Sequence, residues 1–110
     1  MAVLEQDQLK AIVQRIVAAL EPEAVYLYGS HSYGTPHAHS DIDLLVVVSR
    51  NNPPPHQQTV TAYRALRGIG LPVEVRVVSR EDFLRRARWV SSIERVVQEQ
   101  GKLLYGRPIG

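Results

Sequence analysis

The sequence predicts an α/β fold in which a small mixed sheet of three or four strands is flanked by helices. Three patterns carry this prediction. Apolar residues recur at helical spacing through the first twenty residues, two apolar runs of strand length occupy 24–28 and 44–48, and strict alternation marks 73–78. We expect a single domain over residues 1–110, because a chain of this length supports one modest core.

The helices can be placed from apolar spacing and from residues that start or stop helices. The first helix ends at Glu21-Pro22, and a second follows the proline run at 53–55. We expect this second helix to face inward through Val60, Tyr63 and Leu66.

Two further helices are expected after Ser79 and Ser92, which are typical N-cap residues. Their apolar sides are predicted to comprise Phe83, Leu84, Ala87, Val90, Ile93, Val96 and Val97. The second of these helices should stop at Gly101, and residues 102–106 should form a short final strand or a docked tail.

The connection between the two apolar runs carries the candidate site. Gly29-Ser30 ends the first run, ten residues follow, and Asp41-Ile42-Asp43 opens the second. Because a parallel crossover usually needs a dozen residues or more, we expect the two strands to be antiparallel neighbours. The glycine turn and the acidic pair should then meet at one edge of the sheet, with Asp41 and Asp43 on the same face.

These residue types suit metal and phosphate chemistry. Magnesium takes oxygen ligands, commonly one or two carboxylates together with substrate phosphates. Gly29 would let the backbone approach a ligand closely, and a helical turn starting at Ser30 would offer free N–H groups to a phosphate. The structural alternative makes Asp41 a turn residue, but it does not explain Asp43, a carboxylate inside an otherwise apolar strand.

The pattern resembles the nucleotidyltransferase superfamily of DNA polymerase beta, whose signature is Gly-Ser, a spacer and Asp-x-Asp. The ten-residue spacer and the run Leu44–Val47 are similar to the minimal nucleotidyltransferases, the small partners of HEPN-domain proteins. The resemblance implies transfer of AMP from ATP to a hydroxyl. Asp41 and Asp43 would hold two Mg²⁺ ions, and Ser30 with the backbone at Gly29 would hold the outer phosphates.

The resemblance also points to Glu74 on the alternating strand at 73–78. The superfamily usually completes its metal site with an aspartate there, and this sequence carries a glutamate, whose extra methylene moves the carboxylate by about one bond length. As the third catalytic carboxylate, Glu74 would share the metal next to the acceptor oxygen and help to deprotonate it. The structural alternative is that Glu74 and Arg76 form the solvent face of a half-buried strand.

Several classes of partner follow from the same resemblance. The implied partner is a HEPN-type helical protein with a tyrosine acceptor, and the chain would be its antitoxin; a homodimer is an alternative source of the missing acceptor surface. A second hypothesis is an antitoxin that neutralises its partner by binding alone. Transfer to a small molecule such as an aminoglycoside is a third hypothesis.

Composition excludes other classes. No apolar run approaches the about 20 residues that a membrane span requires, and the absence of cysteine excludes disulfides, so we expect a cytoplasmic protein. The late arginines favour a solvated helix face over nucleic-acid binding. The loop histidines His31, His37 and His39 are not expected to bind zinc, because no helix that could align them fits before Pro36.

Overall fold

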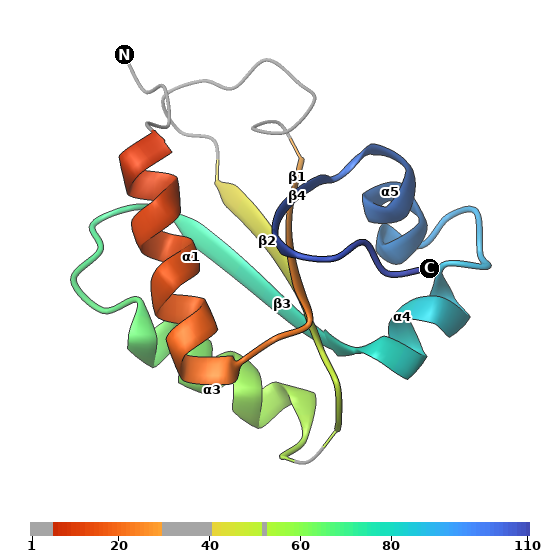
Figure 1. The fold of residues 1–110 in the computed structure, drawn as a ribbon, viewed down its shortest axis with the longest axis horizontal. Helices are drawn as coiled ribbons and strands as arrows, with labels where there is room; N and C mark the ends of the chain where they lie inside the picture. Colours follow the sequence, from red (N-terminus) through yellow and green to blue (C-terminus); the bar gives the residue numbers. More distant parts are fainter. Residues whose placement is uncertain (1–5, 30–40, 52) are drawn as a thin grey trace.

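The computed structural model of the chain confirms the mixed sheet. Strands β1 (Ala24–Tyr28), β2 (Ile42–Val48), β3 (Val73–Ser79) and β4 (Lys102–Gly106) form one sheet in the order β3-β2-β1-β4 (Figure 1). As predicted, β1 and β2 are antiparallel; β3 runs parallel to β2, and β4 runs antiparallel to β1. The structure describes residues 6–29, 41–51 and 53–110.

Helices cover both faces of this sheet. Helices α1 (Gln6–Leu20) and α3 (Pro55–Ala65) lie on one face, and α4 (Arg80–Arg86) and α5 (Ile93–Gln100) lie on the other (Figure 1). Among the described residues, these helices begin close to where the sequence predicts them, and α4 ends earlier than predicted. Within the described ranges, none is both long enough and apolar enough to cross a bilayer.

The two faces of the sheet bury two separate apolar clusters, because successive strand residues point to opposite sides. The cluster under α1 and α3 consists of Ile12, Ile16, Val25, Leu27, Ile42, Leu44, Val46, Val48, Ala62, Leu66 and Val75. The cluster under α4 and α5 consists of Ala24, Tyr26, Leu45, Val47, Val78, Phe83, Val97 and Ile109. Strand β2 contributes to both clusters, so its apolar residues are buried along almost its whole length.

The predicted serine caps are confirmed at α4 and α5. The Ser79 hydroxyl accepts a hydrogen bond from the backbone N–H of Asp82 at 3.1 Å, and the Ser92 hydroxyl accepts one from the N–H of Arg95 at 3.0 Å. Each bond satisfies one N–H of the first helical turn that has no partner inside the helix. Ser79 therefore turns the chain directly from β3 into α4.

The prediction for the inward face of α3 was wrong for Val60, which is 48% exposed. Leu66 is buried, and the hydroxyl of Tyr63 accepts a hydrogen bond from the backbone N–H of Val75 at 2.8 Å, although its side chain is partly exposed. The other inward positions are Gln58 and Ala62. Gln58 is polar, so apolar spacing cannot identify it as an inward residue. Its buried amide donates to the carbonyls of Arg50 and Pro53 at 3.1 and 2.8 Å, which ties the start of the helix to the chain leaving β2.

The apolar side assigned to the segment after Ser79 was also partly wrong. Phe83 and Ala87 are buried, whereas Leu84 lies at the surface and Val90 is 82% exposed. Helix α4 ends at Arg86, and Val90 lies in the turn that leads to α5. Helical spacing counted across that turn therefore places Val90 on the wrong side.

Aromatic packing fixes α4 and the C-terminal tail to the sheet. The rings of Tyr26 and Phe83 stack with centroids 6.0 Å apart, and the Tyr26 hydroxyl accepts a hydrogen bond from the backbone N–H of Ile109 at 2.8 Å. Phe83 is fully buried. These contacts hold the α4–α5 layer on the sheet face that also carries Asp43.

Removing the Phe83 ring should therefore destabilise the fold strongly. We expect Phe83→Ala to lower the free energy of unfolding by about 3 to 5 kcal/mol, because a cavity replaces a stacked, fully buried ring. Leu84→Ala, at the neighbouring exposed position, should cost less than about 1 kcal/mol. Urea denaturation followed by circular dichroism measures both, and equal losses would contradict this account of the packing.

Candidate active site

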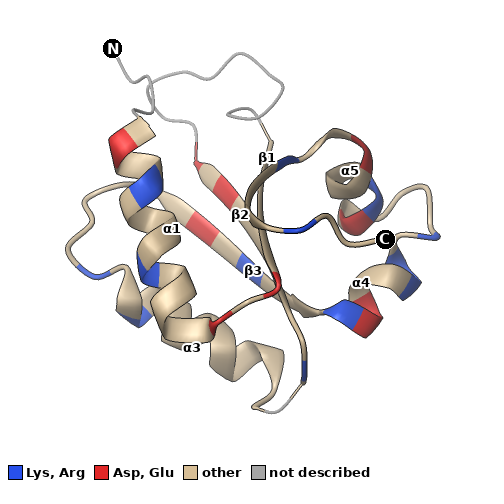
Figure 2. Cartoon of the chain, in the orientation of Figure 1, with Lys and Arg blue, Asp and Glu red and all other residues tan. Residues whose placement is uncertain are grey.

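Three adjacent strands place a tyrosine and two carboxylates in one row across the sheet. Tyr28 at the end of β1 pairs with Asp43 on β2, and Asp43 pairs with Glu74 on β3. Directly paired residues of neighbouring strands point to the same face, and neighbouring strands lie about 4.8 Å apart. In Figure 2 the acidic segments of β2 and β3 lie side by side, and the basic segment of β3 follows its acidic one.

Gly29 follows this row directly and fits closely against Asp43. Its backbone has φ +77°, a left-handed conformation that L side chains rarely adopt. A Cβ atom at this position would collide with Oδ2 of Asp43 and lie 3.4 Å from its Cγ. The glycine is therefore needed twice, for the turn of the backbone and for the space beside the carboxylate.

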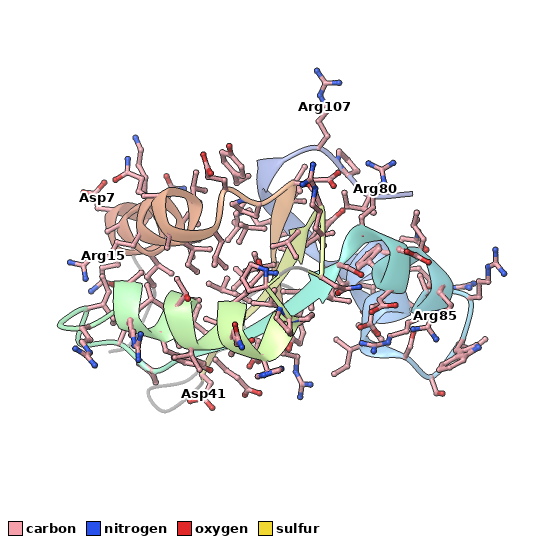
Figure 3. All side chains as sticks on the ribbon, turned by 90° about the horizontal axis from the view of Figure 1, so that it is seen from below. Asp7, Arg15, Asp41, Arg80, Arg85 and Arg107 are labelled. Carbon is pink, nitrogen blue, oxygen red and sulfur yellow. The ribbon has the colours of Figure 1, made fainter. Side chains whose placement is uncertain are left out.

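Asp41 lies at the same end of the sheet, immediately before β2, and is exposed. Figure 3 shows its side chain at the periphery of the molecule, well away from Arg80 and Arg85 on the α4 side. The predicted positions of Ser30 and of the three loop histidines lie outside the described residues. The structure thus brings Gly29, Asp43 and Glu74 together and leaves Asp41 at the entrance to β2.

An arginine lies beside the Glu74 end of the row. Arg76 Nη2 is 3.7 Å from Glu74 Oε1. Burial raises the pKa of the Tyr28 hydroxyl above its usual value, opposed by the positive charge of Arg76 and reinforced by the negative charges of Asp43 and Glu74. The Tyr28 hydroxyl is therefore protonated at neutral pH and lies among the charges of all three residues.

A cavity of about 460 Å³ lies beside this site, along the outer edge of β3. Its lining includes Arg76 from the strand, His56 from α3, and Arg86 and Glu94 from the α4–α5 layer. Glu94 is buried and pairs with Arg86 at 3.6 Å, so this wall of the cavity carries a compensated charge pair. A molecule in the cavity would meet the strand that carries Glu74.

The donor atoms of the site suit a magnesium ion. In the described part of the chain, no three His, Cys, Asp or Glu side chains come close enough together to enclose a metal. Magnesium does not require such a cage, because it keeps several waters and commonly binds one or two carboxylates together with substrate phosphates. Asp41, Asp43 and Glu74 offer only carboxylate oxygens, and the absent side chain of Gly29 leaves space next to Asp43 Oδ2.

Sequence reasoning missed two participants, Tyr28 and Arg76. Alternation could have identified Arg76, which lies two residues after Glu74 on the same face of its strand, and Tyr28 could have been identified because it immediately precedes the glycine turn. The effect of Arg76 on Tyr28 could not have been found, because it depends on which strands are neighbours.

The chain is thus a small α/β unit with acidic residues at the end of an antiparallel strand pair. The sequence model of the family "Polymerase beta, Nucleotidyltransferase" matches residues 8–108, and the chain belongs to this family. A comparison with curated protein sequences found no match.

Solved structures support the same fold. A presumed nucleotidyltransferase from Sulfolobus solfataricus superimposes with a TM-score of 0.64 at 24% identity, over 94% of this chain and 82% of that chain. A toxin–antitoxin structure with AMP-PNP gives a TM-score of 0.53 at 21% identity, over 94% and 75% of the two chains. Spectinomycin adenyltransferase AAD(9) from Enterococcus faecialis, with ATP and spectinomycin, gives 0.70 at 16% identity, and this chain spans 57% of its length.

The close approach of Gly29 to Asp43 can be tested with a matched pair of glycines. Gly29 and Gly68 have nearly the same φ, +77° and +80°, but a Cβ at Gly68 meets no atom within 4 Å. Both Gly→Ala variants should lose about 1 kcal/mol of stability to the backbone. Only Gly29→Ala should lose more stability and weaken binding of Mg²⁺-ATP, because only it displaces the Asp43 carboxylate.

Urea denaturation and isothermal titration calorimetry measure the two effects. If the two variants were indistinguishable in both measurements, the space beside Asp43 would have no role in binding.

Proposed function

We propose that this protein transfers AMP from ATP to a hydroxyl group, and that the acceptor is a tyrosine of a HEPN-type toxin for which this chain is the antitoxin. The observation that carries the proposal is the pairing of Asp43 with Glu74 next to Gly29, within a member of the polymerase beta nucleotidyltransferase family. The similarity in fold to a toxin–antitoxin protein with AMP-PNP supports the choice of partner and nucleotide.

Asp41 and Asp43 would hold two Mg²⁺ ions, and Glu74 would share the metal next to the acceptor oxygen. When bound, magnesium neutralises the charge that builds up on the triphosphate oxygens. Gly29 presents backbone without a side chain, so an outer phosphate can approach it closely. Ser30 is proposed to assist there, as the sequence indicates.

Glu74 would be the proton acceptor. It lies on the edge strand of the sheet, and its side chain is 46% exposed, so an acceptor can reach it from outside. The acceptor hydroxyl loses its proton to Glu74 while its oxygen forms a bond to the α-phosphorus. The bond from the α-phosphorus to the bridging oxygen breaks in line, and pyrophosphate leaves with that oxygen.

Exposed apolar residues favour a protein acceptor. Trp89 and Val90, in the turn between α4 and α5, are 58% and 82% exposed, and Leu84 lies at the surface of α4. Neighbouring large apolar side chains at the surface are typical of surfaces that meet another protein. They support the proposal of a dimer or a hetero-oligomer.

The two competing hypotheses make different predictions about transfer. An antitoxin that acts by binding alone would neutralise its partner without consuming ATP. A small-molecule acceptor is suggested by the similarity in fold to the spectinomycin adenyltransferase, of whose length this chain spans 57%. Incubation with α-labelled ATP, Mg²⁺ and either the protein encoded by the adjacent gene or an aminoglycoside separates the three.

Transfer should depend on the acidic pair at the start of β2. We expect Asp41→Asn with Asp43→Asn to abolish labelling of the partner and to remove the Mg²⁺-dependent part of ATP binding, because neutral amides hold magnesium poorly. The control carries Asp7→Asn with Glu81→Gln, which also removes two charges, from exposed positions of α1 and α4. Calorimetry and label transfer, with and without the partner, are the measurements; unchanged binding by the double variant would contradict the proposed site.

Variants of Glu74 distinguish an enzyme that transfers AMP from an antitoxin that acts by binding alone. If Glu74 is a metal ligand and the proton acceptor, the Glu74→Gln variant should transfer AMP at least about a hundredfold more slowly, each factor of ten being worth ~1.4 kcal/mol. The melting temperature of this variant should hardly change, because the side chain of Glu74 is half exposed. Glu74→Asp keeps the charge and should retain transfer, and Glu81→Gln is the control for loss of an exposed carboxylate. Full transfer by Glu74→Gln would assign the proton to another group.

A further inference from the structure

Arg76 occupies an unusual position for a surface arginine. It follows Glu74 by two residues on the same face of the edge strand, and its Nη2 lies 3.7 Å from Glu74 Oε1. Its charge also acts on the hydroxyl of Tyr28, which belongs to β1, on the far side of the strand that carries Asp43. The positive charge of Arg76 therefore lies on the sheet face that carries both carboxylates, next to Glu74.

This placement has a direct electrostatic reason. Like charges directly opposite each other on neighbouring strands destabilise a sheet, and Asp43 and Glu74 are such a pair. Arg76 supplies the opposite charge from within the chain. Its planar, forked guanidinium suits this role, because it can donate to a carboxylate and a hydroxyl at the same time.

A divalent cation bound by Asp43 and Glu74 would bring its charge to the same place. Two cations repel each other at short range, so a bound metal would weaken the ion pair between Arg76 and Glu74. We propose that Arg76 is a built-in countercharge that competes with the divalent cation for Asp43 and Glu74 and is displaced when the cation binds. This inference rests on the proposed metal-binding function of the row.

The surroundings of Arg76 allow the displacement. Its side chain is 51% exposed, and it lines the cavity of about 460 Å³ beside β3, so it has space to move into. The ion pair with Glu74 is exposed and therefore weak enough to be exchanged. In the free protein, the charge of Arg76 reduces the repulsion between Asp43 and Glu74. When a nucleotide is present, its triphosphate provides further ligands, which raise the affinity of the site for the metal and favour displacement of Arg76.

The test is the binding of Mn²⁺ to the whole chain without nucleotide, followed by the electron paramagnetic resonance signal of free Mn²⁺. We expect Arg76→Gln to bind Mn²⁺ about fivefold more tightly than the unchanged protein, the gain expected from removing one exposed competing charge. Arg80→Gln is the matched control. Arg80 is also half exposed and pairs with Glu23 at 2.9 Å, but it follows β3 at the opposite end of the strand from Glu74.

Thermal melts give a second measurement on the same variants. Without metal, Arg76→Gln should melt at a lower temperature than Arg80→Gln, because Asp43 and Glu74 then repel each other. Added Mg²⁺ should raise the melting temperature of Arg76→Gln more than that of the control. Arg76→Lys, which keeps the charge but lacks the fork, should show a smaller gain in Mn²⁺ affinity of the same sign and serves if Arg76→Gln does not fold.

The outcomes separate this inference from the proposed function. If the unchanged protein binds Mn²⁺ and Arg76→Gln binds it equally or less tightly, Arg76 is not a competitor, although the metal site stands. Equal gains in Arg76→Gln and Arg80→Gln would reduce the effect to net charge and would also overturn the inference. If no variant binds Mn²⁺ with or without ATP, the proposed metal site fails, and the inference fails with it.

Discussion

The register between β2 and its two neighbours is the constraint on which this structure depends. Strand β2 is buried on both faces, and its apolar residues supply both clusters of the core. A slip by one residue would exchange its two faces and turn Asp43 into the apolar cluster under α1 and α3. The same register that packs the core therefore places Asp43 between Tyr28 and Glu74.

The acidic site lies at the end of β2, where a carboxylate has the smallest desolvation penalty. A carboxylate in the middle of β2 would be a buried charge with a large desolvation penalty. Asp43 is the second residue of the strand, and its row lies at the end where the α4–α5 layer leaves the sheet face partly open. Gly29 keeps the backbone close to it without filling the space, and Arg76 balances the negative charge. Because Asp43 lies near the start of the strand, ligands can reach it, and the core contains no buried charge from it.

One face of the sheet is covered by helices, and the other face is partly exposed. Helices α1 and α3 close one face over an apolar cluster that contains no carboxylate. On the other face, α4 and α5 cover the strand ends near Ser79 and leave Glu74 and Arg76 half exposed. Because β3 is also the edge of the sheet, this open half meets the cavity along the strand. An acceptor could approach there without disturbing the core.

By itself the sequence determined the local features: the first three strands, the serine caps, the antiparallel β1–β2 pair, and the shared face of Glu74 and Arg76. These follow from periodicity and from turn chemistry, which act over a few residues. Only the tertiary structure decided that Asp43 lies opposite Glu74, that Tyr28 lies opposite Asp43, and that Gln58 rather than Val60 faces inward. The order of strands and their lateral offset are set by long-range packing of both core clusters, and no pattern within a single segment encodes that packing.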